Sequence, residues 1–232
     1  MAKRALVTGA SGGIGRGIAR RLAREGFAIL GQGRNQAALD ATAEAVRALG
    51  GSFDGRIAEF ADLDAVATLA RWAADAGALD AVIHCAGAYA QTPIAETSFE
   101  AWDRIIDEIV RATMRLTALT LPAVRAAGGT YLFVCGPSSW MGMKGASGYC
   151  VARHAQAGFA RALFEDVRED GVGVTLLHPG FVNTSLVSRE RLDPAKMIQV
   201  DDIAELATQA VLLPRTACVV EMTVRPQRSP YR

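Results

Sequence analysis

A glycine-rich turn near the start of the chain constrains the fold more than any other feature. Residues 8–15 read Thr-Gly-Ala-Ser-Gly-Gly-Ile-Gly and stand between a short apolar run and a segment of helical period. Glycines at such a turn let backbone N–H groups approach a pyrophosphate and let the helix pack closely on the strand. The start of the helix adds unpaired N–H donors and the positive end of a dipole. The turn therefore predicts a dinucleotide site formed by Gly9, Ser11, Gly12, Gly13, Ile14 and Gly15.

Short apolar runs alternate with longer helical segments along the chain, a pattern typical of a parallel sheet covered by helices. We expect strands at residues 5–8, 28–31, 53–58, 81–85, 131–135, 173–178 and 219–224. We expect helices at residues 13–25, 36–49, 63–76, 99–127, 149–169 and 201–213. No Pro, Ser or Gly-rich linker divides the chain. Residues 1–232 are therefore predicted to form one α/β domain, a Rossmann-type doubly wound parallel sheet of about seven strands in three αβα layers.

Composition excludes several other classes of protein. The 25 basic and 24 acidic residues give a net charge of +1, which does not indicate binding to nucleic acid or a membrane surface. We expect a small-molecule partner instead. The four cysteines include no Cys-x-x-Cys pair, and we expect neither a metal site nor a disulfide framework. No signal peptide or membrane span is expected, so the predicted location is the cytoplasm.

Arg34 follows the second predicted strand, in the stretch Gly31-Gln32-Gly33-Arg34-Asn35. An acidic residue at this place binds the ribose 2′-hydroxyl of NAD, whereas an arginine accommodates the 2′-phosphate of NADP. No acid is present here. NADP is therefore the predicted cofactor, with NAD as the alternative. A solvated arginine at the start of the next helix also fits this pattern.

Several motifs together make the chain resemble the short-chain dehydrogenase/reductase family, and among its members the 3-oxoacyl-ACP reductases. Residues 8–15 match the family's Thr-Gly-x-x-x-Gly-x-Gly, Asp62-Leu63 match its adenine-covering pair, and residues 84–87 half match its Asn-Asn-Ala-Gly. Residues 178–184, His-Pro-Gly-Phe-Val-Asn-Thr, resemble the segment that lines the nicotinamide. The resemblance implies cofactor contacts from Asp62, Leu63, Cys85, Ala86, Gly87, Pro179, Gly180, Val182 and Thr184. A helix cap at Asp62, a core thiol at Cys85 and a strand-end histidine at His178 are the structural alternatives.

Tyr149 and Arg153 are the candidate catalytic pair. Reduction of a ketone needs an acid near the carbonyl oxygen, and a fixed cation beside a phenol lowers its pKa. Arg153 stands four residues after Tyr149, on the same face of a helix. The resemblance implies the family's Tyr-x-x-x-Lys, whose cation also binds the nicotinamide ribose. Arginine keeps the charge but replaces a compact ammonium with a planar fork.

Two further family positions are altered. A gap-free alignment from Tyr149 places Gly136 where the family has its carbonyl-orienting serine. Ser138 is the candidate replacement if Gly136-Pro137 redirects the loop, and a plain polar turn is the alternative. The family's asparagine, which supports a proton-relay water, aligns with Ile109. The relay is therefore expected to be absent or rerouted.

The segment of residues 184–200 is predicted to be a substrate lid with apolar side chains, suited to an apolar or acyl substrate, although an ordinary surface connection fits equally. His154 is expected at the surface, because it points about 100° away from Arg153. The family associates through its two long helices, so the resemblance implies a homodimer or homotetramer. The first of these helices is apolar over much of its circumference, at Ile105, Ile106, Ile109, Val110, Met114, Leu116 and Leu119.

The leading hypothesis for function is an NADP-dependent oxidoreductase that reduces a ketone or β-ketoacyl carbonyl to an alcohol, with Tyr149 as the acid. The altered positions keep two alternatives open. The same scaffold could carry out elimination, cyclisation or isomerisation, or it could bind a dinucleotide as a sensor or partner subunit without turnover.

Overall fold

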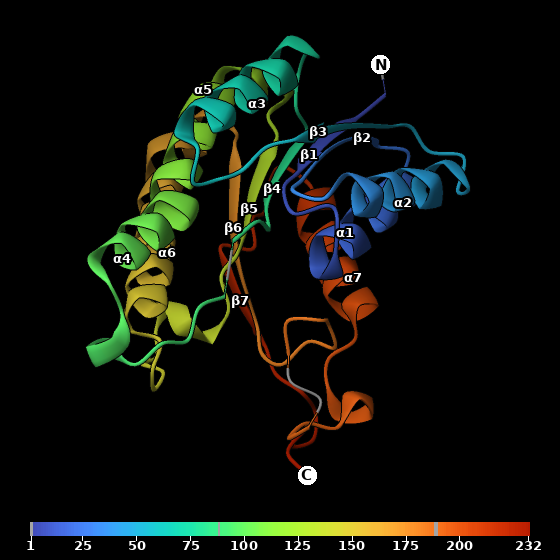
Figure 1. Cartoon of the computed structure of the whole chain (residues 1–232). Helices are drawn as coiled ribbons and strands as arrows, with labels where there is room; N and C mark the ends of the chain where they lie inside the picture. Colours follow the sequence, from blue (N-terminus) through green and yellow to red (C-terminus); the bar gives the residue numbers. More distant parts are fainter. Residues whose placement is uncertain (1, 88, 188–189) are drawn as a thin grey trace.

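Seven parallel strands form one sheet in the computed structural model, which describes residues 2–87, 89–187 and 190–232. Their order is β3-β2-β1-β4-β5-β6-β7, so the strand order reverses between β1 and β4 (Figure 1). Open α/β sheets bind ligands at this switch point, outside the carboxyl ends of the strands. The strands are β1 Arg4–Val7, β2 Ala28–Gly33, β3 Phe53–Ile57, β4 Ala81–His84, β5 Thr130–Val134, β6 Gly173–Pro179 and β7 Glu221–Val224. The predicted doubly wound fold is confirmed.

Helices cover both faces of the sheet, as Figure 1 shows. On one face, α1 (Gly13–Arg24) lies between α2 (Gln36–Arg47) and α7 (Val200–Leu212). The other face carries α3 (Leu63–Asp75), α4 (Phe99–Ile106), α5 (Ala112–Ala127) and α6 (Ser147–Val167). Short 3-10 helices lie at Ile94–Glu96, Pro137–Ser139, Arg168–Asp170 and Pro194–Lys196. The three predicted layers are therefore present.

Strand β1 shows how the sheet serves two apolar cores. Ala5 and Val7 join the core beneath α1, α2 and α7, while Leu6 joins the core beneath α3, α5 and α6. Successive side chains of a strand point to opposite faces, so a central strand must be apolar throughout. All three residues are fully buried.

The predicted helix over residues 99–127 is wrong in one respect, because a π-helix at Asp107–Arg111 separates α4 from α5. Short π-helical segments insert an extra residue into a helical turn and often mark functional sites. Ile109 lies within this turn and is fully buried. No glycine or proline marks the break in the sequence. Pro122, by contrast, lies inside α5 without ending it.

Element ends differ from the predictions by at most two residues. Strand β2 continues to Gly33, two residues beyond its predicted end, because its pairing with β3 extends to Ile57. Strand β7 begins at Glu221 rather than 219. Helix α6 begins at Ser147, so Tyr149 lies in its first turn.

The lid predicted over residues 184–200 is tied down at both ends. Val182 pairs with Ile198, and the Asn183 N–H donates to the Ile198 carbonyl. Leu192 forms an antiparallel bridge with Tyr231, so the C-terminal residues lie against this segment. Residues 188–189 of the predicted lid lie outside the described residues.

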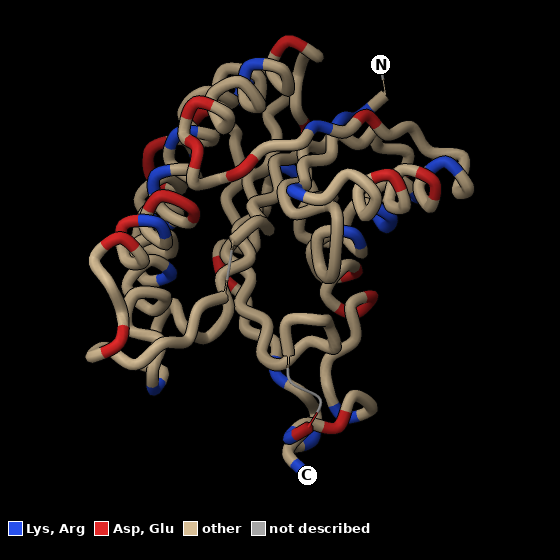
Figure 2. Tube along the Cα trace, in the orientation of Figure 1, with Lys and Arg blue, Asp and Glu red and all other residues tan. Residues whose placement is uncertain are grey.

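Charged residues of both signs are interspersed along the outer helices (Figure 2). Within the described ranges, no helix is long and apolar enough to cross a membrane. The same residues contain no group of three or more His, Cys, Asp or Glu side chains that could hold a metal ion.

Candidate functional site

The glycine turn has the backbone that its sequence predicts. Gly9 and Gly13 have φ values of 66° and 46°, in the left-handed region that favours glycine. Gly15 is needed for a different reason, since a Cβ placed on it would lie 2.3 Å from the Gly9 carbonyl oxygen. The start of α1 and the end of β1 are therefore in backbone contact.

The start of α1 fits a phosphate group. Gly12 caps the helix without a side-chain hydrogen bond, and the first turn contains no acidic residue. A Cβ built on Gly12 would meet no described atom within 4 Å, so the space over the helix start is open. Backbone N–H groups and the positive end of the helix dipole face that space. The predicted residues of this turn thus form a cradle suited to a dinucleotide pyrophosphate.

Thr8 joins the glycine turn to the segment after β4. Its hydroxyl accepts hydrogen bonds of 3.0 Å from the N–H groups of Cys85 and Ala86 and donates to the Ile83 carbonyl. Gly9 approaches Ala86 so closely that a Cβ would lie 3.1 Å from its nitrogen. The predicted residues Cys85, Ala86 and Gly87 therefore lie beside the turn. Burial raises the pKa of the Cys85 thiol to about 12, so it is an unreactive thiol.

Gln32 holds the glycine turn from β2, a role that the sequence patterns missed. Its side-chain oxygen accepts from the Gly9 N–H at 2.9 Å, and its nitrogen donates to the Ala58 carbonyl at 2.6 Å. The side chain is almost fully buried. A polar residue near the end of a buried strand was the only sequence signal for it.

Arg34 and Asp62 lie at the outer end of the cradle. Arg34 is exposed just beyond β2, and its nearest charged partner is Glu59 at 3.8 Å. Asp62 caps α3 by accepting from the N–H groups of Asp64 and Ala65, as its structural alternative predicted. Leu63 packs against the core beneath α3. Arg34 thus keeps an exposed guanidinium just beyond the end of β2.

The segment after β6 lies on the far side of the cradle. The Gly180 N–H donates to the Val224 carbonyl at 2.8 Å, and Val182 is buried at its bridge with Ile198. The Thr184 methyl lies 3.2 Å from the position of a Cβ on Gly13. Thr184, at the end of this segment, is therefore brought to the glycine turn from a distant part of the chain.

Tyr149 and Arg153 are in contact on α6. The Arg153 Nε donates to the Tyr149 phenolic oxygen at 3.2 Å, and the guanidinium carbon lies 5.2 Å from the centre of the Tyr149 ring. Tyr149 is half-buried, while Arg153 is only 6% exposed. The predicted spacing of one helical turn places a cation against the phenol.

Arg153 is held by groups on several elements. Its Nη1 donates to the Val134 carbonyl at 3.1 Å and to Gln156 at 2.7 Å. Its Nη2 lies 2.7 Å from the position of a Cβ on Gly87, so the guanidinium reaches the loop after β4. Burial disfavours the charge of Arg153, but the neighbouring Tyr149 and Cys135 outweigh this effect, and its pKa is raised. Arg153 is therefore a permanent buried cation.

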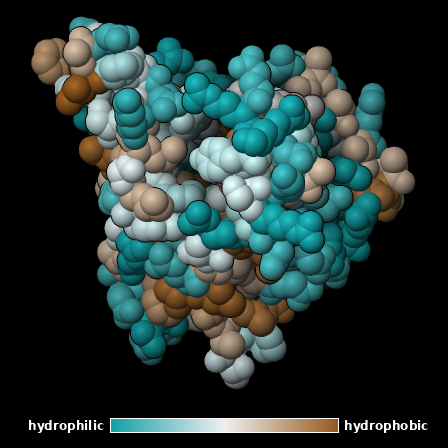
Figure 3. All heavy atoms as spheres, turned by 90° about the horizontal axis from the view of Figure 1, so that it is seen from below, coloured by the Kyte–Doolittle hydropathy of each residue, from teal (hydrophilic) through white to brown (hydrophobic). Residues whose placement is uncertain are grey.

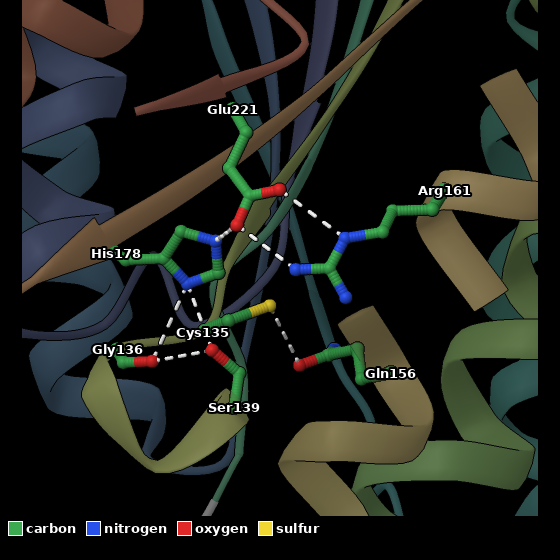
Figure 4. A network of polar contacts seen from close by, with 7 residues as sticks. All are labelled: Cys135, Gly136, Ser139, Gln156, Arg161, His178 and Glu221. Carbon is green, nitrogen blue, oxygen red and sulfur yellow. Dashed lines mark hydrogen bonds and ion pairs between the residues drawn. The ribbon is translucent and has the colours of Figure 1, made fainter. Parts of the chain in front are cut away.

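The two serines after β5 differ in what they contact. The Ser139 hydroxyl lies 2.6 Å from the Gly136 carbonyl oxygen and 2.8 Å from His178 Nδ1 (Figure 4). Ser138 is buried beside it, and none of the described residues hydrogen-bonds its hydroxyl. Gly136 has a φ of 78°, which turns the chain into the 3-10 helix Pro137–Ser139. A glycine favours this left-handed backbone.

His178 joins this loop to the edge of the sheet. Its Nε2 lies 2.9 Å from Glu221 Oε1, at ion-pair distance but outside hydrogen-bond geometry. Arg161 pairs with the same carboxylate and lowers the pKa of Glu221 (Figure 4). Burial lowers the pKa of His178, although the Gly136 carbonyl and the Glu221 carboxylate oppose this effect. Ser139, His178 and Glu221 are the residue types of a hydrolase triad, but the Ser139 hydroxyl is hydrogen-bonded to the Gly136 carbonyl. Their contacts brace the loop.

Ile109 and Tyr89 border Tyr149 on its other sides. Ile109 packs in a small apolar cluster with Ile105 and Ala152, against which the Tyr149 ring also lies. The side of the Tyr149 ring that faces α4 and the π-helix is therefore lined by aliphatic side chains. Tyr89, which sequence patterns did not single out, places its ring edge on Tyr149 with centroids 5.2 Å apart. Its hydroxyl donates to Gln91, which in turn donates to the Lys144 carbonyl.

Large apolar side chains are exposed on the loops after β4, β5 and β6. Figure 3 views this end of the molecule and shows apolar surface in separate areas around a hollow. The exposed side chains on these loops include Tyr89, Trp140, Met141, Met143 and Leu186. Such a rim favours a substrate with an apolar body.

Comparisons with known proteins agree with this geometry. The model of the short chain dehydrogenase family matches residues 3–195. The short-chain reductase protein NovJ of Streptomyces niveus is 33% identical over 191 residues, which cover 81% of this chain and 73% of that protein. Cyclohexanol dehydrogenase of Acinetobacter is 28% identical over 207 residues, which cover 88% of this chain and 82% of that protein.

Solved structures share nearly the whole fold. An alcohol dehydrogenase of the archaeon Thermococcus sibiricus, complexed with 5-hydroxy-NADP, has a TM-score of 0.89 and 26% identity, and the match covers 99% of both chains. A short chain dehydrogenase of Burkholderia cenocepacia in complex with NADP has a TM-score of 0.88 and 26% identity, with 97% of this chain and 96% of that chain covered. The glycine turn, the sheet order and the family match lead to one conclusion. The chain belongs to the short-chain dehydrogenase family.

Proposed function

We propose that this protein is an NADP-dependent oxidoreductase that reduces the carbonyl group of a small apolar or acyl molecule to an alcohol. The observation that carries the proposal is the hydrogen bond from Arg153 to the phenol of Tyr149. The Arg153 guanidinium also lies against Gly87, in the loop that contacts the glycine turn. A phenol paired with a buried cation can donate its proton to a carbonyl oxygen, and the cation stabilises the charge left on the phenol.

The cofactor would be held by groups already described. The start of α1 and its glycine turn would bind the pyrophosphate, and Arg34 would bind the 2′-phosphate. Arg153 Nη2, which lies next to Gly87, would reach the nicotinamide ribose. The relatives crystallised with NADP support this assignment, as does the absence of an acid after β2.

The chemistry divides between the cofactor and the chain. When bound, the reduced dinucleotide supplies the hydride that adds to the carbonyl carbon. Tyr149 donates its phenolic proton to the carbonyl oxygen, and Arg153 stabilises the negative charge left on the phenol. Ser138 orients the carbonyl oxygen through a hydroxyl that no described residue engages. The apolar rim excludes water from the substrate.

A homodimer or homotetramer is part of the proposal. Of the apolar residues on the first long helix, Ile105, Ile109 and Leu116 are core, while Met114 and Leu119 are exposed on α5. Two large apolar side chains on one exposed helix favour burial against a second copy. Sedimentation at micromolar concentration should give more than one chain per particle, and a monomer would contradict this part.

Tyr149→Phe tests the reaction. NADPH oxidation is followed across a panel of cyclic ketones, aryl ketones and β-ketoacyl thioesters. We expect kcat to fall by about 10²-fold or more, because the phenylalanine ring has no proton to donate. Binding of NADPH, followed by its fluorescence, should change by less than about twofold. A variant that reduces a substrate as fast as the parent would remove Tyr149 from its role.

One alternative follows from the expected alignment of Ile109 with the family's asparagine and of Gly136 with its serine. It is supported by the aliphatic packing of Ile109 beside Tyr149 and by the absence of a side chain at Gly136. A scaffold so altered could carry out elimination, cyclisation or isomerisation, with Tyr149 still as acid or base. The mass of the product separates the two functions, since reduction adds two hydrogens and isomerisation adds none. A dinucleotide-binding or partner role would appear as affinity for NADPH without turnover on any substrate.

A further inference from the structure

We infer that Gln156 is a positioning residue that fixes the plane of the Arg153 guanidinium, so that an arginine can serve where the family has lysine. The inference rests on the proposed function and adds to it a residue that touches neither cofactor nor substrate. Gln156 is on α6, one turn beyond Arg153, and is only 1% exposed.

Both ends of the Gln156 carboxamide are engaged. Its oxygen accepts from Arg153 Nη1 at 2.7 Å, and its nitrogen donates to the Thr113 hydroxyl at 3.0 Å. A guanidinium has donors only, so the amide cannot reverse without setting an NH₂ group against Arg153. Because Thr113 lies in α5, Gln156 links Arg153 to a second helix.

Cys135 gives the amide oxygen a second partner. Its Sγ lies 3.5 Å from the Gln156 oxygen, as Figure 4 shows. Burial raises the pKa of the Cys135 thiol to about 12, so the thiol keeps its proton and can donate it. The oxygen of Gln156 thus stays between two donors and has no reason to turn away from Arg153.

A planar cation needs such a partner, whereas a compact ammonium does not. The guanidinium must turn its Nε toward Tyr149 and its Nη2 toward Gly87 at the same time. Bonds from Nη1 to Gln156 and to the Val134 carbonyl fix the rotation that allows both. Without Gln156, one Nη1 proton of Arg153 would be buried without an acceptor, and the guanidinium could rotate toward a different acceptor.

The neutral amide is also the suitable chemical group. A glutamate at this place would hold the guanidinium but would cancel its charge beside Tyr149. Glutamine orients the cation and leaves its charge to act on the phenol. Gln156→Glu and Gln156→Leu therefore separate orientation from charge.

A double-mutant cycle tests the inference, with a carbonyl compound that the wild-type enzyme reduces as the substrate. We expect Gln156→Leu to lower kcat about 10-fold or more and to change the KM of the carbonyl substrate by less than about twofold. In an Arg153→Lys background, the same change should cost less than about twofold, because a lysine has no plane to fix. Equal losses in the two backgrounds would overturn the inference. Gln209→Leu, on the exposed face of α7, controls for the substitution itself.

The pH profile separates positioning from packing. Gln156→Glu should retain the fold and move the falling limb of the kcat profile to higher pH by about one unit, since its carboxylate neutralises the cation. If the falling limb of the Gln156→Glu profile stayed at the wild-type pH, this result would count against the inference. If Gln156→Leu does not fold, the glutamate variant carries the test.

A measurement on the ligand-free protein distinguishes this inference from the proposed function. The Nε–H signal of Arg153, identified in NMR spectra by its loss in Arg153→Lys, should exchange slowly with water in wild type and in Gln156→Glu. In Gln156→Leu we expect exchange at least about 10-fold faster. Unchanged exchange overturns the role of Gln156 even if the enzyme reduces ketones. Fast exchange confirms it even if no carbonyl is reduced, in which case only the proposed reaction fails.

Discussion

Gly15 lies against Gly9 so closely that a Cβ on Gly15 would stand 2.3 Å from the Gly9 carbonyl oxygen. Gly12, three residues earlier, has no described atom within 4 Å of the position of its Cβ. We expect Gly15→Ala to lower the free energy of unfolding by about 2 kcal/mol or more, since backbone must move. Gly12→Ala should leave stability unchanged but weaken NADPH binding about 10-fold or more, because its methyl enters the phosphate space. Denaturant unfolding and NADPH fluorescence measure the two effects, and identical behaviour of the two variants would contradict the cradle.

Arg34 should decide the preference between NADPH and NADH. Its guanidinium is exposed after β2 and forms a long ion pair of 3.8 Å with Glu59. Arg34→Gln should weaken NADPH binding about 10-fold or more, because a charge-assisted bond to the 2′-phosphate is lost, and leave NADH binding unchanged. Arg56→Gln, at an exposed arginine of β3, is the matched control. An equal loss for both cofactors would assign Arg34 a structural role.

Ser138 and Ser139 should respond differently to loss of the hydroxyl. Ser138→Ala should lower kcat about 10-fold and leave the melting temperature unchanged, since its hydroxyl bonds no described residue. Ser139→Ala should lower the free energy of unfolding by about 1 to 2 kcal/mol, because His178 Nδ1 loses its partner at 2.8 Å. Assays of ketone reduction and thermal unfolding check the pair. A Ser138→Ala variant with full activity would leave that serine without a role.

His84 should make the fold sensitive to acid. Its ring is stacked on Phe133 at 4.5 Å, and burial lowers its pKa to about 3. The unfolded chain takes up this proton near its ordinary pKa of 6.5, so stability falls as the pH drops from about 6.5 toward 3. The contribution of His84 to the change in the free energy of unfolding approaches about 1.4 kcal/mol per pH unit.

His84→Asn removes that slope. The variant should be less stable than wild type at pH 7, since it loses the stack and the contact with Thr117. Between about pH 6 and 4, however, its urea-unfolding free energy should decline less steeply. The exposed His154→Asn serves as the control and should keep the wild-type slope. Parallel curves for wild type and His84→Asn would show that His84 is not the sensitive group.

Local patterns predicted the elements whose causes are local. The apolar run 5–8 and the glycines after it identify β1 and the start of α1, because turn, strand and helix signals agree within fifteen residues. The pair Tyr149 and Arg153 was predicted for the same reason, since helical spacing alone brings them together. The π-helix at Asp107–Arg111 has no such signal, as its residues have ordinary helical propensity.

Residues that act through long-range contacts could not be predicted. Glu221 meets His178 only because β7 pairs with β6, and Gln156 meets Thr113 only because α5 and α6 cover the same face. Gln32 on β2 meets Gly9 only because the neighbouring β1 places the glycine turn beside it. In each case the sequence contains a polar residue in an apolar segment, which indicates that a partner exists but not which one.

The hydroxyl of Thr8 links two loops of the site, the glycine turn after β1 and the loop after β4. It accepts from Cys85 and Ala86 while its own residue opens the glycine turn. The loops after β1 and β4 are therefore fastened together at one oxygen, on strands that are already hydrogen-bonded neighbours. A displacement of one loop relative to the other would break these hydrogen bonds. The Thr8 hydroxyl thus helps to set the distance between the phosphate cradle and Gly87, and this distance would suit a dinucleotide of one length.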